Sequence, residues 1–172
     1  MQRNLKDFSG KEPIFIDANI FLHHAFDSNA DSIDFLKKVE TDNLKAFTSA
    51  LVIEEITFKL LIQSASNFLP GVNLQKVKDL LRDRLRREKV IAPVEAYRSY
   101  IDRLKDFGLK VLDLTDEDMK RALQLSKAYG LFTADASHVA VMERARISSL
   151  ATGDSDFQVL KQINVWSPRS KR

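Results

Sequence analysis

Four carboxylates in this 172-residue sequence occur where an apolar stretch ends or where a predicted helix begins. Asp17 directly follows "PIFI" and Asp154 follows "ISSLAT", whereas Glu55 and Asp135 lie near the starts of predicted helices. Crowded carboxylates repel and raise one another's pKa unless a cation neutralises them. Because an all-oxygen ligand set suits Mg²⁺ or Mn²⁺, these residues predict a metal site that could orient water for phosphodiester hydrolysis.

Each of these acidic residues also has a simpler interpretation. Asp17, Asp135 and Asp154 could cap a helix or stabilise a turn, because aspartate competes for nearby backbone donors. Glu55 could belong to a solvated pair with Glu54. Only one residue of that pair can face a site, since neighbouring positions on a helix differ by about 100°.

Three histidines accompany the acidic residues. His138 is three residues after Asp135 and could reach the same site, although a packed or surface position is the simpler expectation. His23 and His24 are adjacent, so a helix would point them about 100° apart and they could not bind one ion together.

The elements that must position these side chains alternate between strands and helices. Apolar stretches predict strands at 13–17, 44–49, 109–114, 147–152 and 163–166. Periodicity and capping signals predict helices at 19–27, 30–42, 50–65, 115–130 and 134–145, and another from near Pro93 to Gly108. The alternation favours a three-layer α/β/α fold with a central parallel sheet. Such sheets bind ligands beyond the carboxyl ends of their strands, where the four carboxylates would meet.

The chain reads as one domain spanning residues 1–172, because no repeat or long linker divides it. Within it we expect a polar N-terminal flank at 1–12, a helical excursion at 67–107 and a basic tail at 167–172. The absence of cysteine excludes disulfides and cysteine-based zinc sites. No apolar stretch approaches the roughly 20 residues that span a membrane, and the N-terminus does not read as a secretory signal. We therefore expect a cytoplasmic protein with no membrane association.

Positive charge is concentrated in one segment, although the net charge of the chain is only +3. The stretch "KVKDLLRDRLRREK" at 76–89 has seven basic and three acidic residues. A local basic patch is typical of a surface that binds a polyanion, but it can equally be the solvated face of a helix. The candidate nucleic-acid-binding residues of this segment are Lys78, Arg82, Arg84, Arg86 and Arg87.

Four short motifs together resemble the PIN domain, a nuclease fold that is common in VapC-type toxins. They are "IDANIF" at 16–21, "TSALVIEEI" at 48–56, "TADASHVAV" at 133–141 and "TGDSDF" at 152–157. Their order and spacing agree with the family, and from the first motif to the last they span most of the chain. The resemblance implies a central parallel sheet and ribonuclease activity that depends on Mg²⁺ or Mn²⁺.

The resemblance also assigns roles to individual residues. It implies that Asp17, Glu55, Asp135 and Asp154 are the acidic metal ligands and catalytic residues. Auxiliary roles in orienting or supporting these carboxylates would fall to Asn19, Thr152 and Asp156. The implied partners are RNA, an antitoxin protein and a second copy of the chain in a homodimer.

Two functions remain open at this stage. One is a metal-dependent endoribonuclease, including the toxin of a toxin–antitoxin pair. The other is a catalytically silent module of the same fold that binds RNA or protein, because a fold does not dictate a function. Rival enzyme classes fit less well. A haloacid-dehalogenase phosphatase needs a second aspartate where Asn19 stands, and no G-x-G-x-x-G follows the first strand.

Overall fold

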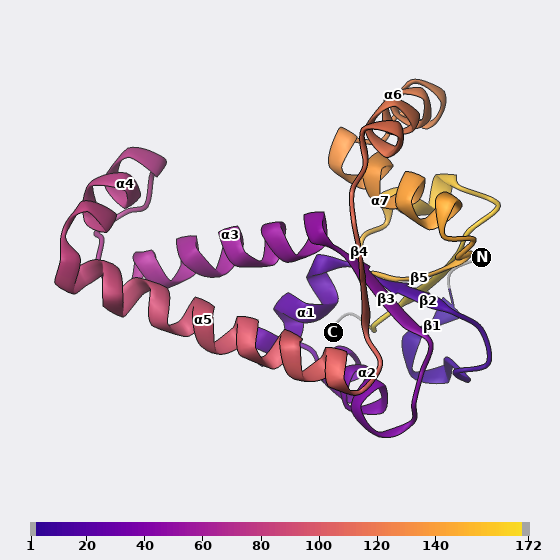
Figure 1. Ribbon diagram of the computed structural model, residues 1–172, viewed down its shortest axis with the longest axis horizontal. Helices are drawn as coiled ribbons and strands as arrows, with labels where there is room; N and C mark the ends of the chain where they lie inside the picture. The colour runs from indigo at the N-terminus through magenta and orange to yellow at the C-terminus, as the bar shows by residue number, and fades with distance from the viewer. Residues whose placement is uncertain (1–2, 170–172) are drawn as a thin grey trace.

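A six-stranded, all-parallel sheet forms the centre of the protein in the computed structural model, which describes residues 3–169 (Figure 1). Its strand order is β1-β6-β5-β2-β3-β4. The strands are β1 (Arg3–Asn4), β2 (Ile14–Ile16), β3 (Ala46–Ser49), β4 (Lys110–Leu112), β5 (Ser149–Ala151) and β6 (Asn164–Ser167). Every neighbouring pair is parallel, so the carboxyl ends of all six strands lie at the same edge of the sheet.

Residues 3–169 also form seven α-helices. They are α1 (Ala18–Ala25), α2 (Ala30–Thr41), α3 (Ala50–Ser66), α4 (Leu74–Arg82), α5 (Arg84–Asp106), α6 (Asp116–Tyr129) and α7 (Thr133–Arg144). Helices α6 and α7 pack together on one side of the sheet, and α1 and α2 lie on the other (Figure 1). Two short 3-10 helices are η1 (Leu5–Asp7) and η2 (Asp156–Val159). The predicted α/β class with a central parallel sheet is confirmed.

The central strands are buried on both faces, which explains their continuous apolar sequences. All three residues of β2 are fully buried, and so is Leu150 at the middle of β5. Local signals then start the helices. Thr115 and Asp118 form a reciprocal capping box at the start of α6, and Gly130 ends that helix with a left-handed backbone at φ 73°.

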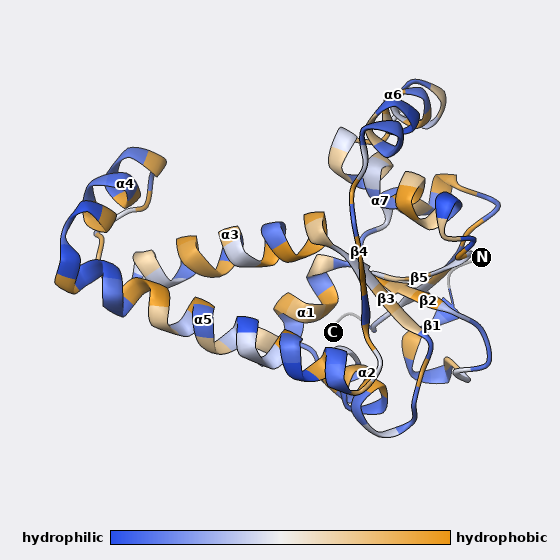
Figure 2. Cartoon of the chain, viewed as in Figure 1, coloured by the Kyte–Doolittle hydropathy of each residue, from blue (hydrophilic) through white to orange (hydrophobic). Residues whose placement is uncertain are grey.

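Helices α3, α4 and α5 form an arm that extends away from the sheet (Figure 1). Helices α3 and α5 run side by side, and α4 packs at their far end. The far end has its own small apolar cluster, built from Ala65, Val77, Leu80 and Val90. Residues 74–89, here called the basic tip, are mostly hydrophilic (Figure 2). The segment predicted at 67–107 as a helical excursion therefore contains α4 and α5.

The predicted helix start at Pro93 is wrong. Helix α5 begins at Arg84, and the Asp83 carboxylate caps it by accepting a hydrogen bond of 2.8 Å from Arg86 N. Pro93 lies inside the helix on an exposed position, where it removes one backbone hydrogen bond. Packing of the buried Val90 and Val94 on either side of Pro93 keeps α5 continuous through this position.

Both terminal segments make more contacts with the rest of the protein than their polar sequences predict. The segment expected as a polar flank at 1–12 contains β1, and its side chains Leu5 and Phe8 are buried in the main core. In the predicted basic tail, Ser167 ends β6, and Arg169 forms an ion pair of 3.0 Å with Asp31. Residues 170–172 of that tail lie outside the described residues. Across residues 3–169, no helix is long and apolar enough to cross a membrane.

Candidate metal centre

The site begins where β2 and β5 end side by side. These strands are in register at Ile16 and Ala151, so the next residues, Asp17 and Thr152, are neighbours although 135 positions separate them. Thr152 Oγ1 donates a hydrogen bond of 2.7 Å to Asp17 Oδ2. The chain leaves β2 toward β3 on one side, while β5 lies on the other. The site therefore occupies a topological switch point, the usual ligand position in open α/β sheets.

Asp17 is held by a network of hydrogen bonds. Its Oδ1 accepts from Ala18 N at 2.6 Å, and its Oδ2 also accepts from Asn19 Nδ2. Asn19 is fixed in turn by Gly153 N, which donates to its Oδ1 at 2.8 Å, and by a contact of 2.9 Å with Thr152 Oγ1. Burial raises the pKa of Asp17, because the charged form loses its hydration.

Glu55 reaches the same place from α3, which follows β3 directly. Ser49 caps this helix by accepting a hydrogen bond of 3.2 Å from Val52 N. The Glu55 side chain is 29% exposed and faces the site, whereas Glu54 points to solvent. The neighbouring His138 imidazole and the Lys59 ammonium, which pairs with Oε1, lower the pKa of Glu55 to about 2.

Asp135 is the third residue of α7, and its carboxylate has no hydrogen-bond donor within residues 3–169. The predicted capping role is therefore absent, and the side chain is half-buried beside other carboxylates. Burial is the largest cause that raises the pKa of Asp135 to about 6, and the negative charges of Asp154, Asp17 and Glu55 add to it. A half-buried carboxyl without a donor is suited to accept a cation.

Asp154 completes the acidic group on the loop after β5. Its backbone N–H donates to Thr152 Oγ1 at 3.0 Å, and its Oδ1 accepts from Asp156 N at 2.9 Å. Asp154 thus also stabilises a turn, as its simpler interpretation predicted. The Asp156 side chain itself is exposed.

The four predicted ligands line one cavity of about 400 Å³, here called the acidic cavity. Its lining is Asp17, Asn19, His23, Glu55, Lys59, Asp135, Gly153, Asp154 and Ser155. Asp156 is outside this lining. The predicted RNA-binding residues are also elsewhere, exposed on the basic tip of the arm.

Sequence reasoning did not assign Lys59 or His23 to the cavity. Each follows a predicted site residue by four positions, Lys59 after Glu55 and His23 after Asn19, and this spacing places both on the cavity side of their helices. His23 Nδ1 is 3.0 Å from Ser32 Oγ, which orients its ring. The helical spacing was a usable signal for both residues.

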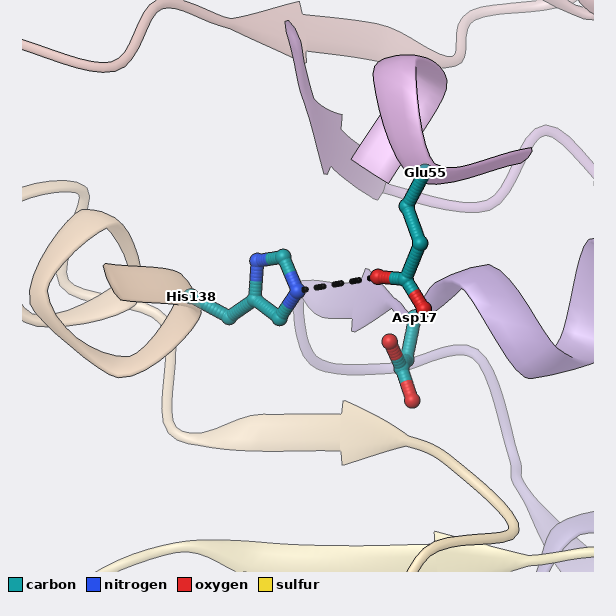
Figure 3. A group of neighbouring side chains, drawn as sticks. All are labelled: Asp17, Glu55 and His138. Carbon is teal, nitrogen blue, oxygen red and sulfur yellow. Dashed lines mark ion pairs between the residues drawn. The ribbon is translucent and has the colours of Figure 1, made fainter. Parts of the chain in front are cut away.

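His138 is buried as its simpler interpretation expected, but it belongs to the site. Its side chain is 2% exposed, and its Nε2 lies 3.8 Å from Glu55 Oε2 (Figure 3). One ligand atom from each of Asp17, Glu55 and His138 lies within 4.8 Å of the other two. Asp17 and Glu55 line the acidic cavity together with Asp135 and Asp154, and His138 lies next to Glu55 outside this lining. The charge and the spacing of these donors fit a divalent cation.

The fold and the site define a class of protein. It is an all-parallel α/β protein with an acidic cavity at the switch point of its sheet. The model of the PIN domain family matches residues 14–162, and this chain belongs to that family.

Similar proteins come from bacteria and archaea. The chain is 29% identical to Ribonuclease VapC6 of Methanocaldococcus jannaschii over 153 residues, which cover 88% of this chain and 95% of the relative. Among solved structures, it is similar to one of VapBC2 from Rickettsia felis bound to a promoter DNA fragment, with a TM-score of 0.56, 12% identity and coverage of 91% and 98% of the two chains. A toxin–antitoxin complex from Klebsiella pneumoniae matches with a TM-score of 0.55, 14% identity and coverage of 87% and 94%. At these identities, the two structures establish the shared fold.

Proposed function

We propose that this protein is a metal-dependent endoribonuclease that hydrolyses RNA phosphodiester bonds at the acidic cavity. The observation that carries the proposal is the convergence of Asp17, Glu55, Asp135 and Asp154, from four separate segments, on one cavity. Burial and mutual repulsion raise the pKa of Asp17 and of Asp135, so the cluster disfavours the folded state when no counter-charge is present. A bound cation accounts for such an arrangement.

The four carboxylates would hold one or two Mg²⁺ or Mn²⁺ ions. When bound, the ion supplies an oriented water molecule and stabilises negative charge on the phosphoryl oxygens. Asn19 and Thr152 are positioning residues, because they hold Asp17 through the hydrogen bonds described above. Asp156 supports Asp154 through its backbone N–H. The products of hydrolysis would be an RNA end with a 5′-phosphate and one with a 3′-hydroxyl.

The basic tip would hold the RNA backbone away from the cavity. Lys78, Arg82, Arg84, Arg86 and Arg87 are all exposed there. From Glu55, α3 continues for another eleven residues to Ser66, or roughly 16 Å of helix. A substrate that touches both the cavity and the tip must therefore span several nucleotides.

The function as a toxin is proposed from the relatives. One solved neighbour is a toxin–antitoxin complex, and the matched curated relative is a VapC ribonuclease. We therefore include an antitoxin protein and a second copy of the chain among the partners. Induced expression in a bacterial host should arrest growth, the Asp17→Asn variant should not, and co-expression of an adjacent small gene should relieve the arrest. Light scattering should give twice the monomer mass of 19.6 kDa.

The direct test is cleavage of a mixed RNA pool with Mn²⁺, followed by mapping of the new 5′ ends. Glu55→Gln and Glu54→Gln form a matched pair, because the two residues are adjacent but only Glu55 lines the cavity. We expect cleavage in the wild type and in Glu54→Gln, and none in Glu55→Gln or with EDTA. Equal cleavage by both variants would contradict the proposal and would indicate a contaminating nuclease.

A further inference from the structure

His138 is a buried histidine of α7 that lies beside the Glu55 carboxylate. Neither ring nitrogen has a hydrogen-bond partner within residues 3–169, and the residue is 1% exposed. The ring packs against Phe15 of β2, with ring centroids 5.9 Å apart. Buried polar atoms without a hydrogen bond disfavour the folded state and are rare in proteins, so such a position calls for a ligand or a functional explanation.

The His138 ring packs against Phe15, while its Nε2 is directed toward the carboxylates of the site. Its Nε2 points toward Glu55 Oε2 at 3.8 Å, with the Asp17 carboxylate beside them (Figure 3). This distance is too long for a hydrogen bond. Ligands placed about 2.1 Å from an octahedral ion are about 3.0 Å apart when adjacent and about 4.2 Å apart when opposite. The observed separation lies between these two values.

We propose that His138 Nε2 is a direct ligand of the divalent cation, and that this nitrogen makes the centre prefer Mn²⁺ over Mg²⁺. This inference rests on the proposed metal-dependent function. It replaces an all-oxygen ligand set by a mixed one, in which Asp17 and Glu55 supply oxygen and His138 supplies nitrogen.

The preference follows from the chemistry of the two ions. Mg²⁺ binds oxygen almost exclusively and keeps several of its waters, whereas imidazole is a good ligand for first-row transition ions. The environment of the other ring nitrogen, Nδ1, limits how much His138 can add to Mn²⁺ affinity. Within residues 3–169, His138 Nδ1 has no hydrogen-bond acceptor of the kind that usually orients a ligating histidine, and packing that includes Phe15 aligns the ring. We therefore expect His138 to contribute about tenfold to Mn²⁺ affinity, which equals the low end of the 10–100-fold loss seen when a hydrogen-bond partner of a metal ligand is removed.

The chain allows a direct spectroscopic test because it has only three histidines. Pulsed electron paramagnetic resonance of the Mn²⁺-loaded, untagged protein detects the coupling of a directly bound ¹⁴N nucleus. The essential variant is the double substitution His23→Gln with His24→Gln, which leaves His138 as the one remaining histidine. We expect an imidazole ¹⁴N coupling in the wild type and in this double variant, and its loss in His138→Gln.

Titration calorimetry gives the second measurement. In His138→Gln, the dissociation constant for Mn²⁺ should rise about tenfold, while that for Mg²⁺ should change less than about twofold. His23→Gln is the matched control, because His23 lines the cavity but is outside the group of closely spaced ligand atoms. If His138→Gln fails to fold, the double variant still decides the question.

The outcomes separate this inference from the proposed function. Mn²⁺ binding without an imidazole coupling would overturn the role of His138 and leave an all-oxygen metal site. Failure of Mn²⁺ to bind the wild type would overturn both proposals. A coupling that disappears in the double variant would assign the nitrogen to His23 or His24 and would also overturn this inference.

Discussion

The acidic cavity and the basic tip of the arm carry opposite charges and hold them in different ways. In the cavity, Asp17 is 6% exposed and accepts hydrogen bonds from three groups. On the tip, Arg82 and Arg84 are exposed and form ion pairs with Asp79 and Glu88 on their own helices. Such exposed ion pairs contribute little to the stability of the fold, because water and salt screen them.

The difference shows which charges need a partner that is not part of the chain. Burial is the main cause that raises the pKa of Asp135 to about 6, and the negative charges of the neighbouring cavity carboxylates add to it. The charged side chains of the tip are exposed to water, so they need no partner to be stable. We therefore expect substitutions in the cavity to change specific binding and substitutions on the tip to change mainly the salt dependence.

The largest effect is expected for Asp17→Asn. It should weaken Mn²⁺ binding by more than about 100-fold, beyond the 10–100-fold typical of residues that only support a ligand. The metal-free melting temperature at pH 7 should not fall, because burial raises the pKa of Asp17 and so disfavours its charged form. Calorimetry and thermal unfolding with and without Mn²⁺ measure both quantities. Wild-type Mn²⁺ affinity in this variant would show that Asp17 is not a ligand.

Thr152→Val should have the next largest effect. The change keeps the shape of the side chain but removes the hydroxyl that joins Asp17, Asn19 and Asp154. We expect a 10–100-fold loss of Mn²⁺ affinity and a destabilisation of about 1–3 kcal/mol in chemical unfolding. Thr57→Val is the matched control, since this exposed threonine bonds only its own helix. Equal Mn²⁺ affinities for the two variants would show that the Thr152 hydroxyl does not support the metal site.

Neutralising the basic tip should weaken the binding of RNA of any sequence to a similar extent. In the quadruple variant of Arg82, Arg84, Arg86 and Arg87 to Gln, the slope of log affinity for single-stranded RNA against log salt should become shallower by about 3, or about 0.7 per lost phosphate contact. Mn²⁺ affinity should remain within about twofold of wild type. Filter binding across salt concentrations tests this, and an unchanged slope would assign the tip another role.

The smallest expected effect is on the pH dependence of the folding stability of the metal-free protein. The pKa of Asp135 is 3.8 when unfolded and about 6 when folded, so the folded state binds more protons between these values. The resulting stabilisation is complete below pH 3.8 and is lost as the pH rises through about 6. Asp17 acts in the same direction. The lowered pKa of Glu55 acts in the opposite direction, but only as the pH falls below 4.5.

Denaturant unfolding between about pH 5 and pH 7, compared between the wild type and Asp135→Asn, tests the contribution of Asp135. Asp135→Asn should make the decline in stability shallower over this range, whereas Asp156→Asn, an exposed neighbour of the site, should not. A decline of wild-type size in Asp135→Asn would show that this residue does not share the charge of the cavity.

Much of the fold followed from local patterns. The strand before Asp17 and the strand before Thr152 were predicted because continuous apolar stretches mark buried parallel strands. The helix after Thr115 was predicted from its capping residues and from Gly130. The prediction failed at Pro93, because packing along α5 outweighs the local preference of proline for a first turn.

The sequence by itself determined which carboxylates could meet, because a parallel sheet places all of its strand ends at one edge. Only the tertiary structure decided that β5 lies beside β2, which brings Thr152 within 2.7 Å of Asp17. It also decided that His138 faces Glu55 and that the basic tip lies away from the cavity. Strand order and the direction of buried side chains depend on packing between distant segments, and local sequence patterns do not encode that packing.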